Sequence, residues 1–396
     1  MVLSKFLKTV GQLSRSILDD KIIINKSSPM DGKIWSKYLK YAVLVLVAAG
    51  AARWMLLSLG PQRPAPAFVA PKRVAQTTAL PETLRNILSA TNSVDRTRSI
   101  QQLRHWLSSL PKDQAASAVR QILASGQDAR TGQGFKLNPD GSLSQAPTLR
   151  TLLLDMLGKL DPAQAADVAK EILQLKNSAD EWSVALALYA RVNTTDDALS
   201  FLQQKAEEMA SYPPWQHNPS VGYLEAFDIF VYTDDTDFVS ALSQFTSDKG
   251  NPALAHAAFL ALDRLVQNDP MNTLETLQDN TALLNGQAAT EGGFFARSDV
   301  RDPDQKALLA AYLLSSDRTL AELEAFAGLY PNENFMVSPN LLTASPTLSN
   351  AELLSRYQAA EQAVSQWLQD SQFSSVWPQL QQIQGRLSRI MNGTAP

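Results

Sequence analysis

Twenty consecutive residues near the N-terminus, Tyr41–Gly60, are almost entirely apolar and carry a single charged side chain, Arg53. An α-helix of this length rises about 30 Å, which matches the hydrocarbon core of a lipid bilayer. Pro61, Pro64 and Pro66 follow directly, and proline cannot continue a helix. The segment therefore predicts one membrane-spanning helix over residues 41–60.

The distribution of positive charge around this segment predicts its orientation. Eight of the nine Lys and Arg residues in 1–60 precede the span, whereas only Arg63, Lys72 and Arg73 follow it closely. Positive residues accumulate on the cytoplasmic side of membrane helices. We therefore expect a single-pass protein of the bacterial inner membrane, with its N-terminus in the cytoplasm and its body in the periplasm.

Two other targeting signals compete with this interpretation. A cleaved signal peptide has a short basic region before its apolar stretch, whereas here 40 residues precede the span. A mitochondrial targeting segment is basic and poor in acids, whereas Asp19 and Asp20 are acidic and lysine outnumbers arginine. An uncleaved signal anchor agrees better with the sequence than either alternative.

The predicted span also contains candidate partner-binding residues. Ala48 and Ala52 are small and lie four residues apart, which lets a second helix approach closely. Ala49 and Arg53 share a helix face. Arg53 either extends its charge to the membrane surface or meets an acid or carbonyl of an intramembrane partner.

Four segments follow from these patterns. Residues 1–40 form a basic cytoplasmic segment with an amphipathic helix, and residues 41–60 form the span. Residues 61–80 form a proline-rich linker, since prolines cannot sustain regular hydrogen-bonded structure. Residues 81–396 form the extracytoplasmic body.

The body predicts an all-α fold. Amphipathic runs of 12–18 residues alternate with short breaks that contain Pro, Asp or Asn, and such residues begin helices. Stacked helix pairs bury faces that no pair buries alone, so we expect a solenoid-like α-helical-repeat domain with a HEAT-like or tetratricopeptide-like pattern. Residues 134–143 contain the turn sequence Asn138-Pro139-Asp140-Gly141, which predicts a small hairpin or loop insertion.

The sequence contains no recognisable catalytic or cofactor motif. The chain has no cysteine, which excludes thiolate metal sites, iron–sulfur clusters and thiol nucleophiles. Its three histidines are isolated in the sequence and no HExxH or GxSxG motif occurs. The acidic body has no basic stripe that nucleic acid would require. We therefore expect no enzymatic activity, no cofactor, no metal and no nucleic-acid partner.

Aromatic residues in predicted breaks between helices give a second set of candidates. Rigid rings in loops on one face of a solenoid can anchor a protein partner or a saccharide, or they can fix the loops to the core. The candidates are the ring-bearing residues Tyr212, Trp215, His217, Phe294 and Phe295, together with the neighbouring Arg297.

These expectations favour a membrane-anchored, non-enzymatic scaffold or accessory subunit that binds a protein partner of an envelope or inner-membrane complex. The protein would bind its partner through the helical body and the transmembrane helix, and the transmembrane helix would also contact the lipid bilayer. Two alternatives remain open: an enzyme acting on cell-wall or other polysaccharides through a helical superhelix, and a transmembrane signalling protein.

Overall fold

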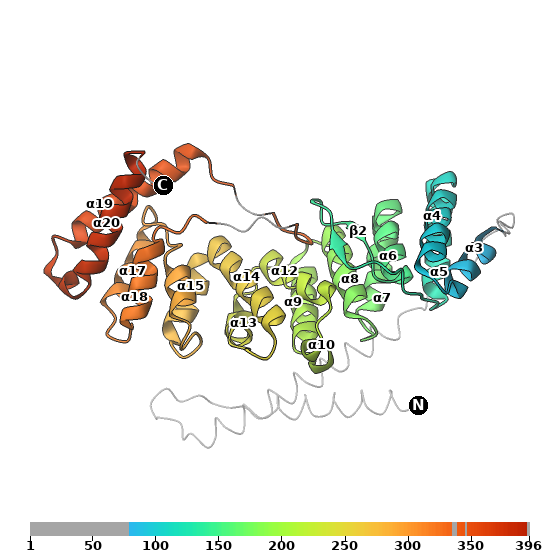
Figure 1. Cartoon of the computed structure of the whole chain (residues 1–396), viewed down its shortest axis with the longest axis horizontal. Coiled ribbons are helices and arrows are strands. Elements are labelled where there is room, and N and C mark those ends of the chain that lie inside the picture. The colour runs from blue at the N-terminus through green and yellow to red at the C-terminus, as the bar shows by residue number, and fades with distance from the viewer. Residues whose placement is uncertain (1–78, 335–338, 345–346, 394–396) are drawn as a thin grey trace, which may run out of the picture. The chain divides into compact units, whose positions relative to one another are not determined.

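The computed structural model describes residues 79–334, 339–344 and 347–393, which fall in one compact unit. The unit is mostly helical and contains a small two-stranded hairpin (Figure 1). In these ranges no helix is long and apolar enough to cross a bilayer. The predicted span lies outside them, as do the linker up to residue 78 and the candidates Ala48, Ala49, Ala52 and Arg53.

The helices of the first half are α3 (Ala79–Ser89), α4 (Ser93–Ser109), α5 (Lys112–Ala124), α6 (Leu149–Leu160), α7 (Pro162–Ile172), α8 (Ala179–Val192) and α9 (Asp196–Ala210). The shorter central elements are α10 (Pro213–His217), α11 (Val221–Glu225), α12 (Asp228–Tyr232), the 3-10 turn η1 (Thr236–Phe238) and α13 (Val239–Thr246). The last elements are α14 (Pro252–Asn268), α15 (Pro270–Asp279), α16 (Ala288–Phe295), α17 (Pro303–Leu314), α18 (Leu320–Leu329), α19 (Asn350–Trp367), the 3-10 turn η2 (Ser371–Val376) and α20 (Trp377–Met391).

The predicted start signals are where helices begin. Pro162, Pro252 and Pro303 each occupy the first turn of a helix, after an Asp or Asn whose side chain accepts a hydrogen bond from a backbone N–H of that turn. Thr319 and Ser349 instead form reciprocal capping boxes with the glutamates three residues later. These caps satisfy N–H groups that have no partner within the helix.

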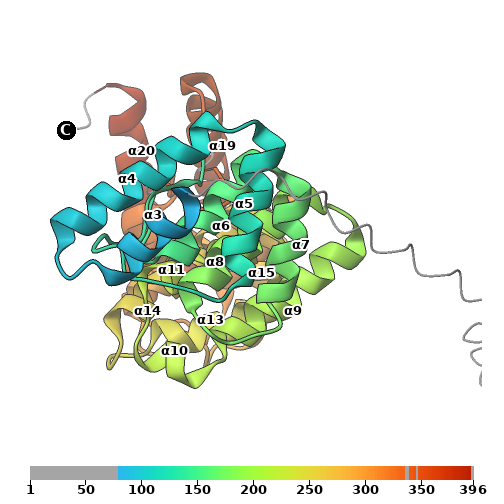
Figure 2. The same ribbon diagram turned by 90° about the vertical axis from the view of Figure 1, so that its right-hand side faces the viewer.

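Each helix packs chiefly on helices that are close to it in the sequence. The most extensive contacts are between α7 and α8, between α16 and α18, and between α13 and α14. Seen from the end that carries α3 and α4, the later helices lie behind them (Figure 2). The buried apolar side chains form one continuous core cluster that extends from Ile87 to Leu387.

The hairpin prediction is confirmed. β1 (Lys136–Leu137) pairs antiparallel with β2 (Leu143–Gln145). Gly141 adopts a φ of +73°, a conformation that costs glycine little, and its N–H donates to the carbonyl of Asn138 at 3.0 Å.

The structure differs from the sequence prediction at the Gly292–Arg297 segment. We expected a break between helices, but Phe294 and Phe295 lie in α16 and are buried. Of the two glycines that favour a break, Gly292 is required by packing. A Cβ at Gly292 would lie 2.7 Å from both the Glu322 carbonyl oxygen and the Phe326 nitrogen. Glycine therefore lets α16 approach the backbone of α18.

The connection between α18 and α19 spans residues 330–349 and contains no helix or strand among its described residues. It leaves α18, and its residues Leu341–Thr343 contact α8 and α12 before the chain enters α19. Connections of this length without secondary structure are uncommon in compact domains and are often functional.

Candidate functional site

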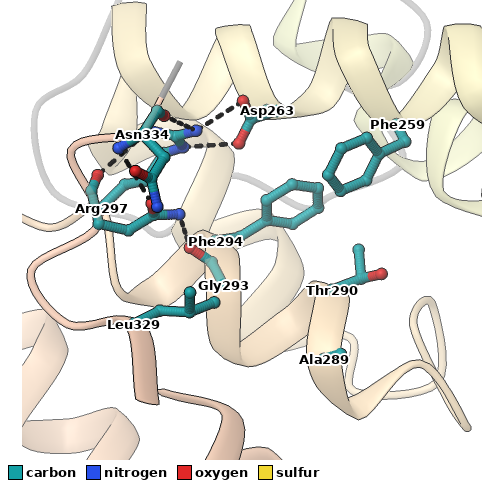
Figure 3. A pocket seen from close by; sticks show the side chains of 10 residues that line it. Phe259, Asp263, Ala289, Thr290, Gly293, Phe294, Arg297, Leu329 and Asn334 are labelled. Atoms are coloured by element: carbon teal, nitrogen blue, oxygen red, sulfur yellow. Dashed lines mark hydrogen bonds and ion pairs between the residues drawn. The ribbon is translucent and has the colours of Figure 1, made fainter. Parts of the chain in front are cut away.

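A cavity of about 230 Å³ lies between α14, α16 and the beginning of the connection that follows α18 (Figure 3). Its lining combines one apolar and one polar wall. The residues are Phe259, Asp263, Ala289, Thr290, Gly293, Phe294, Arg297, Leu329, Asn332 and Asn334.

Two stacked aromatic rings form the apolar wall. The ring centroids of Phe259 and Phe294 are 5.6 Å apart with an interplanar angle of 21°, and Leu329 lies across the cavity from them (Figure 3). Ala289 is exposed and Thr290 is half-buried, so this turn of α16 borders the opening. An apolar group that entered here would leave water for a ring-lined surface, which is favourable.

The polar wall is organised by Arg297. Its Nε and Nη2 donate to the two carboxylate oxygens of Asp263 at 2.5 and 2.7 Å. Its Nη2 also donates to the Asn334 carbonyl at 2.7 Å, and its Nη1 donates to the Asn332 carbonyl at 3.2 Å. One buried guanidinium, in the turn that follows α16, thus joins that turn to α14 and to the connection after α18.

Asn332 holds the start of that connection against α16. Its backbone N–H donates to the Ala296 carbonyl at 2.7 Å, and its side-chain amide donates to the Gly293 carbonyl at 3.2 Å. Sequence analysis did not single out Asn332 or Asn334. The signal that was present is a helix-free stretch rich in amide side chains, which bond readily to backbone groups.

Electrostatics keep this wall close to neutral. Burial raises the pKa of Asp263 above the ordinary carboxyl value, and the Arg297 guanidinium opposes that rise. Elsewhere in α16, Glu291 is buried and pairs with Arg318. Burial and the nearby Glu322 raise the pKa of Glu291 to about 7, while Arg318 opposes the shift.

The cavity offers a limited set of chemical groups. Among the described residues that line it, Asp263 is the one carboxylate, and Arg297 engages both of its oxygens. Most glycoside hydrolases use a pair of carboxylates that flank the scissile sugar bond. What the walls provide instead is an apolar floor beside backbone carbonyls and amides, a combination that suits an apolar side chain of a peptide.

The remaining candidates do not line this cavity. Phe295 stacks on Tyr312 with ring centroids 4.0 Å apart. The ring centroid of Trp215 lies 5.4 Å from that of Trp182 and 4.9 Å from that of Tyr212, in an aromatic cluster on α8 and α10.

The predicted loop around Tyr212 is in fact the short helix α10. The Lys176 ammonium lies 4.7 Å from the centre of the Tyr212 ring, a cation–π contact. His217 is exposed, and its Nδ1 lies 2.6 Å from the Pro213 carbonyl oxygen. The Trp215 ring is therefore a packing anchor of α10, and His217 is the most accessible of the three candidates.

Within the described part of the chain, no group of three or more His, Asp or Glu side chains is arranged to hold a metal ion. Comparison with known proteins adds no relative, since no family model, no curated protein and no solved structure matches the chain.

Proposed function

We propose that this protein is a membrane-anchored, non-enzymatic scaffold that binds a protein partner of an inner-membrane or envelope complex through its helical body. The anchor is the apolar stretch 41–60, and the body is extracytoplasmic by the charge distribution around that stretch. The helices belong to a solenoid-like repeat of the HEAT or tetratricopeptide pattern. Packing between helices that are close in sequence supports this assignment.

The observation that carries the proposal is the cavity beside Phe294. Interfaces concentrate their binding energy in a few apolar anchors that fill well-formed pockets. The partner inserts a large apolar side chain between Phe259, Phe294 and Leu329. The carbonyls of Asn332 and Asn334, already fixed by Arg297, lie beside the backbone of the inserted segment.

Site-specific photocrosslinking in intact membranes tests this proposal. A benzophenone amino acid replaces Ala289, which is exposed and borders the cavity, and illumination should join the chain to one discrete partner protein. The matched control places the same amino acid at Ala351, which is exposed in the first turn of α19 and does not line the cavity. A crosslinking pattern that is the same at both positions, or no product at either, would contradict the proposal.

A further inference from the structure

The middle of the connection between α18 and α19 occupies a second site. This site shares no residue with the lining of the Phe294 cavity. We call residues Pro339–Ala344 the tip. The tip contacts Arg191 of α8 and Asp228 of α12, and its contacts with Asp228 join residues 114 and 115 positions apart in the chain.

The Asp228 side chain binds mainly to backbone groups of the tip. Its Oδ2 accepts from the N–H groups of two consecutive residues, Leu342 at 2.7 Å and Thr343 at 3.0 Å. Its Oδ1 accepts from the Thr343 hydroxyl. The Asp228 side chain is 4% exposed and is held by Arg264, whose Nη1 lies 2.7 Å from Oδ1. A buried carboxylate that is oriented in this way makes strong charge-assisted hydrogen bonds.

The opposite side of the tip meets α8 and the hairpin. The Nη2 of Arg191 donates to the Leu341 carbonyl at 3.0 Å and to the Asp140 carbonyl at 3.4 Å. The Leu341 side chain is 1% exposed. Gly141 lies directly against the Leu341 backbone, since a Cβ on Gly141 would lie 2.2 Å from the Leu341 carbonyl oxygen.

These contacts have the character of peptide recognition. The tip contributes one buried side chain, one hydroxyl and three backbone groups, and it forms no helix or strand of its own. The tip bends at Leu341 and Leu342, and bound peptide segments likewise gain affinity from backbone hydrogen bonds and specificity from one or two pockets. We propose that Arg191, Asp228, Arg264 and Gly141 form a peptide-acceptor site that takes a partner segment with leucine followed two residues later by threonine, and that the tip is a competing ligand held in the same chain.

The full-length chain in detergent micelles tests the competition. In one variant, Pro339–Ala344 is replaced by six glycine and serine residues, which removes the ligand and keeps the connection length. A fluorescent synthetic peptide with the sequence of residues 339–344 is the probe, and its anisotropy reports binding. A tethered ligand competes at an effective concentration in the millimolar range, so we expect the peptide to bind this variant at least tenfold more tightly than the wild-type chain.

Asp228→Asn in the tip-replaced chain should weaken peptide binding at least tenfold, as should Leu341→Asp within the peptide. Circular dichroism confirms that each variant is folded. A folded tip-replaced chain that does not bind the peptide at millimolar concentration, or that binds it equally well with Asn at position 228, would overturn the proposal.

Hydrogen exchange on the wild-type chain gives a second test that needs no variant. A tip that a partner peptide can displace must detach while the helices stay folded. Such local opening requires less free energy than global unfolding. The amides of Leu342 and Thr343 should therefore exchange at least a hundredfold faster than those of buried residues in α14, such as Leu262. Equal protection of both sets would mean that the tip is a permanent structural element and would overturn the proposal.

Discussion

The guanidinium of Arg297 holds both carboxylate oxygens of Asp263, at 2.5 and 2.7 Å, across 34 positions of the sequence. Both side chains are more than nine-tenths buried. The pair joins the turn after α16 to α14, and Nη1 and Nη2 of Arg297 also donate to the carbonyls of Asn332 and Asn334. The polar wall of the candidate cavity therefore depends on this one arginine.

Removing one partner of this pair should be far more damaging than removing both. Arg297→Met leaves a buried, unpaired Asp263 carboxylate, so we expect the free energy of unfolding to fall by about 3–5 kcal/mol. In Asp263→Leu/Arg297→Met, apolar side chains replace both charges, and most of that loss should be recovered. Denaturant titrations followed by circular dichroism measure the difference. A double variant as unstable as the single one would show that the Asn332 and Asn334 contacts, rather than the charge pair, account for the loss.

Adjacent glycines of α16 provide a matched test of helix packing. A Cβ at Gly292 would lie 2.7 Å from backbone atoms of α18, whereas a Cβ at Gly293 would lie 3.4 Å from the Leu329 side chain, an ordinary contact. Gly292→Ala should lower the free energy of unfolding by about 1–3 kcal/mol, as overpacking does. Gly293→Ala should leave it unchanged or raise it slightly, because alanine favours the helix. Equal melting temperatures for the two variants would contradict the close approach of α16 and α18.

Asp235 should make stability depend on pH. It is 2% exposed, and its Oδ2 has no hydrogen-bond partner among the described residues. Burial, together with the nearby Glu207, raises its pKa to about 6. Between about pH 4, near the ordinary carboxyl pKa, and pH 6, the folded chain binds a proton that the unfolded chain releases. This group therefore lowers stability as pH rises through that window.

Asp235→Asn removes this titration. We expect the variant to melt at a higher temperature than the wild-type chain at pH 7.5, with a smaller difference at pH 4.5. Thermal unfolding at both pH values measures the effect. A difference in melting temperature that does not change with pH would show that the carboxyl titrates alike in the folded and unfolded chains.

Much of the helical order could be predicted from local sequence signals. Asp161-Pro162, Asn251-Pro252 and Asp302-Pro303 indicated helix starts because capping depends on residues within one turn. The turn at Asn138–Gly141 indicated the hairpin for a similar reason.

The candidate cavity could be predicted only in part. The residue types of Phe294 and Arg297 make them candidates, but the glycines before them favour a loop. Local helix propensity depends on neighbouring residues only. It cannot show that Gly292 is needed for the close approach of α18, which begins more than 25 positions later. No periodic pattern in the sequence predicts that Arg297 pairs with Asp263 or that Asp228 binds the tip. Both contacts join segments that are far apart in the chain.

Membrane topology is a separate expectation, because the predicted span lies outside the described residues. Reporter fusions after Leu80 should give high alkaline phosphatase activity and low β-galactosidase activity, since the charge distribution favours an extracytoplasmic body. Alkaline extraction should leave the chain in the membrane pellet. The opposite reporter pattern would invert the topology, and release into the soluble fraction would mean that the apolar segment is cleaved.

The central claim, that the cavity beside Phe294 is where a protein partner binds, is tested most directly by co-purification from native membranes in mild detergent. Ala289→Trp fills the opening from an exposed position, and Ala351→Trp is the control on α19. We predict that wild-type chain and Ala351→Trp retain the same partner at equal yield, whereas Ala289→Trp loses at least nine-tenths of it while its melting temperature is unchanged. Equal recovery of the partner with all three chains, or recovery of the wild-type chain alone and monodisperse, would contradict the claim.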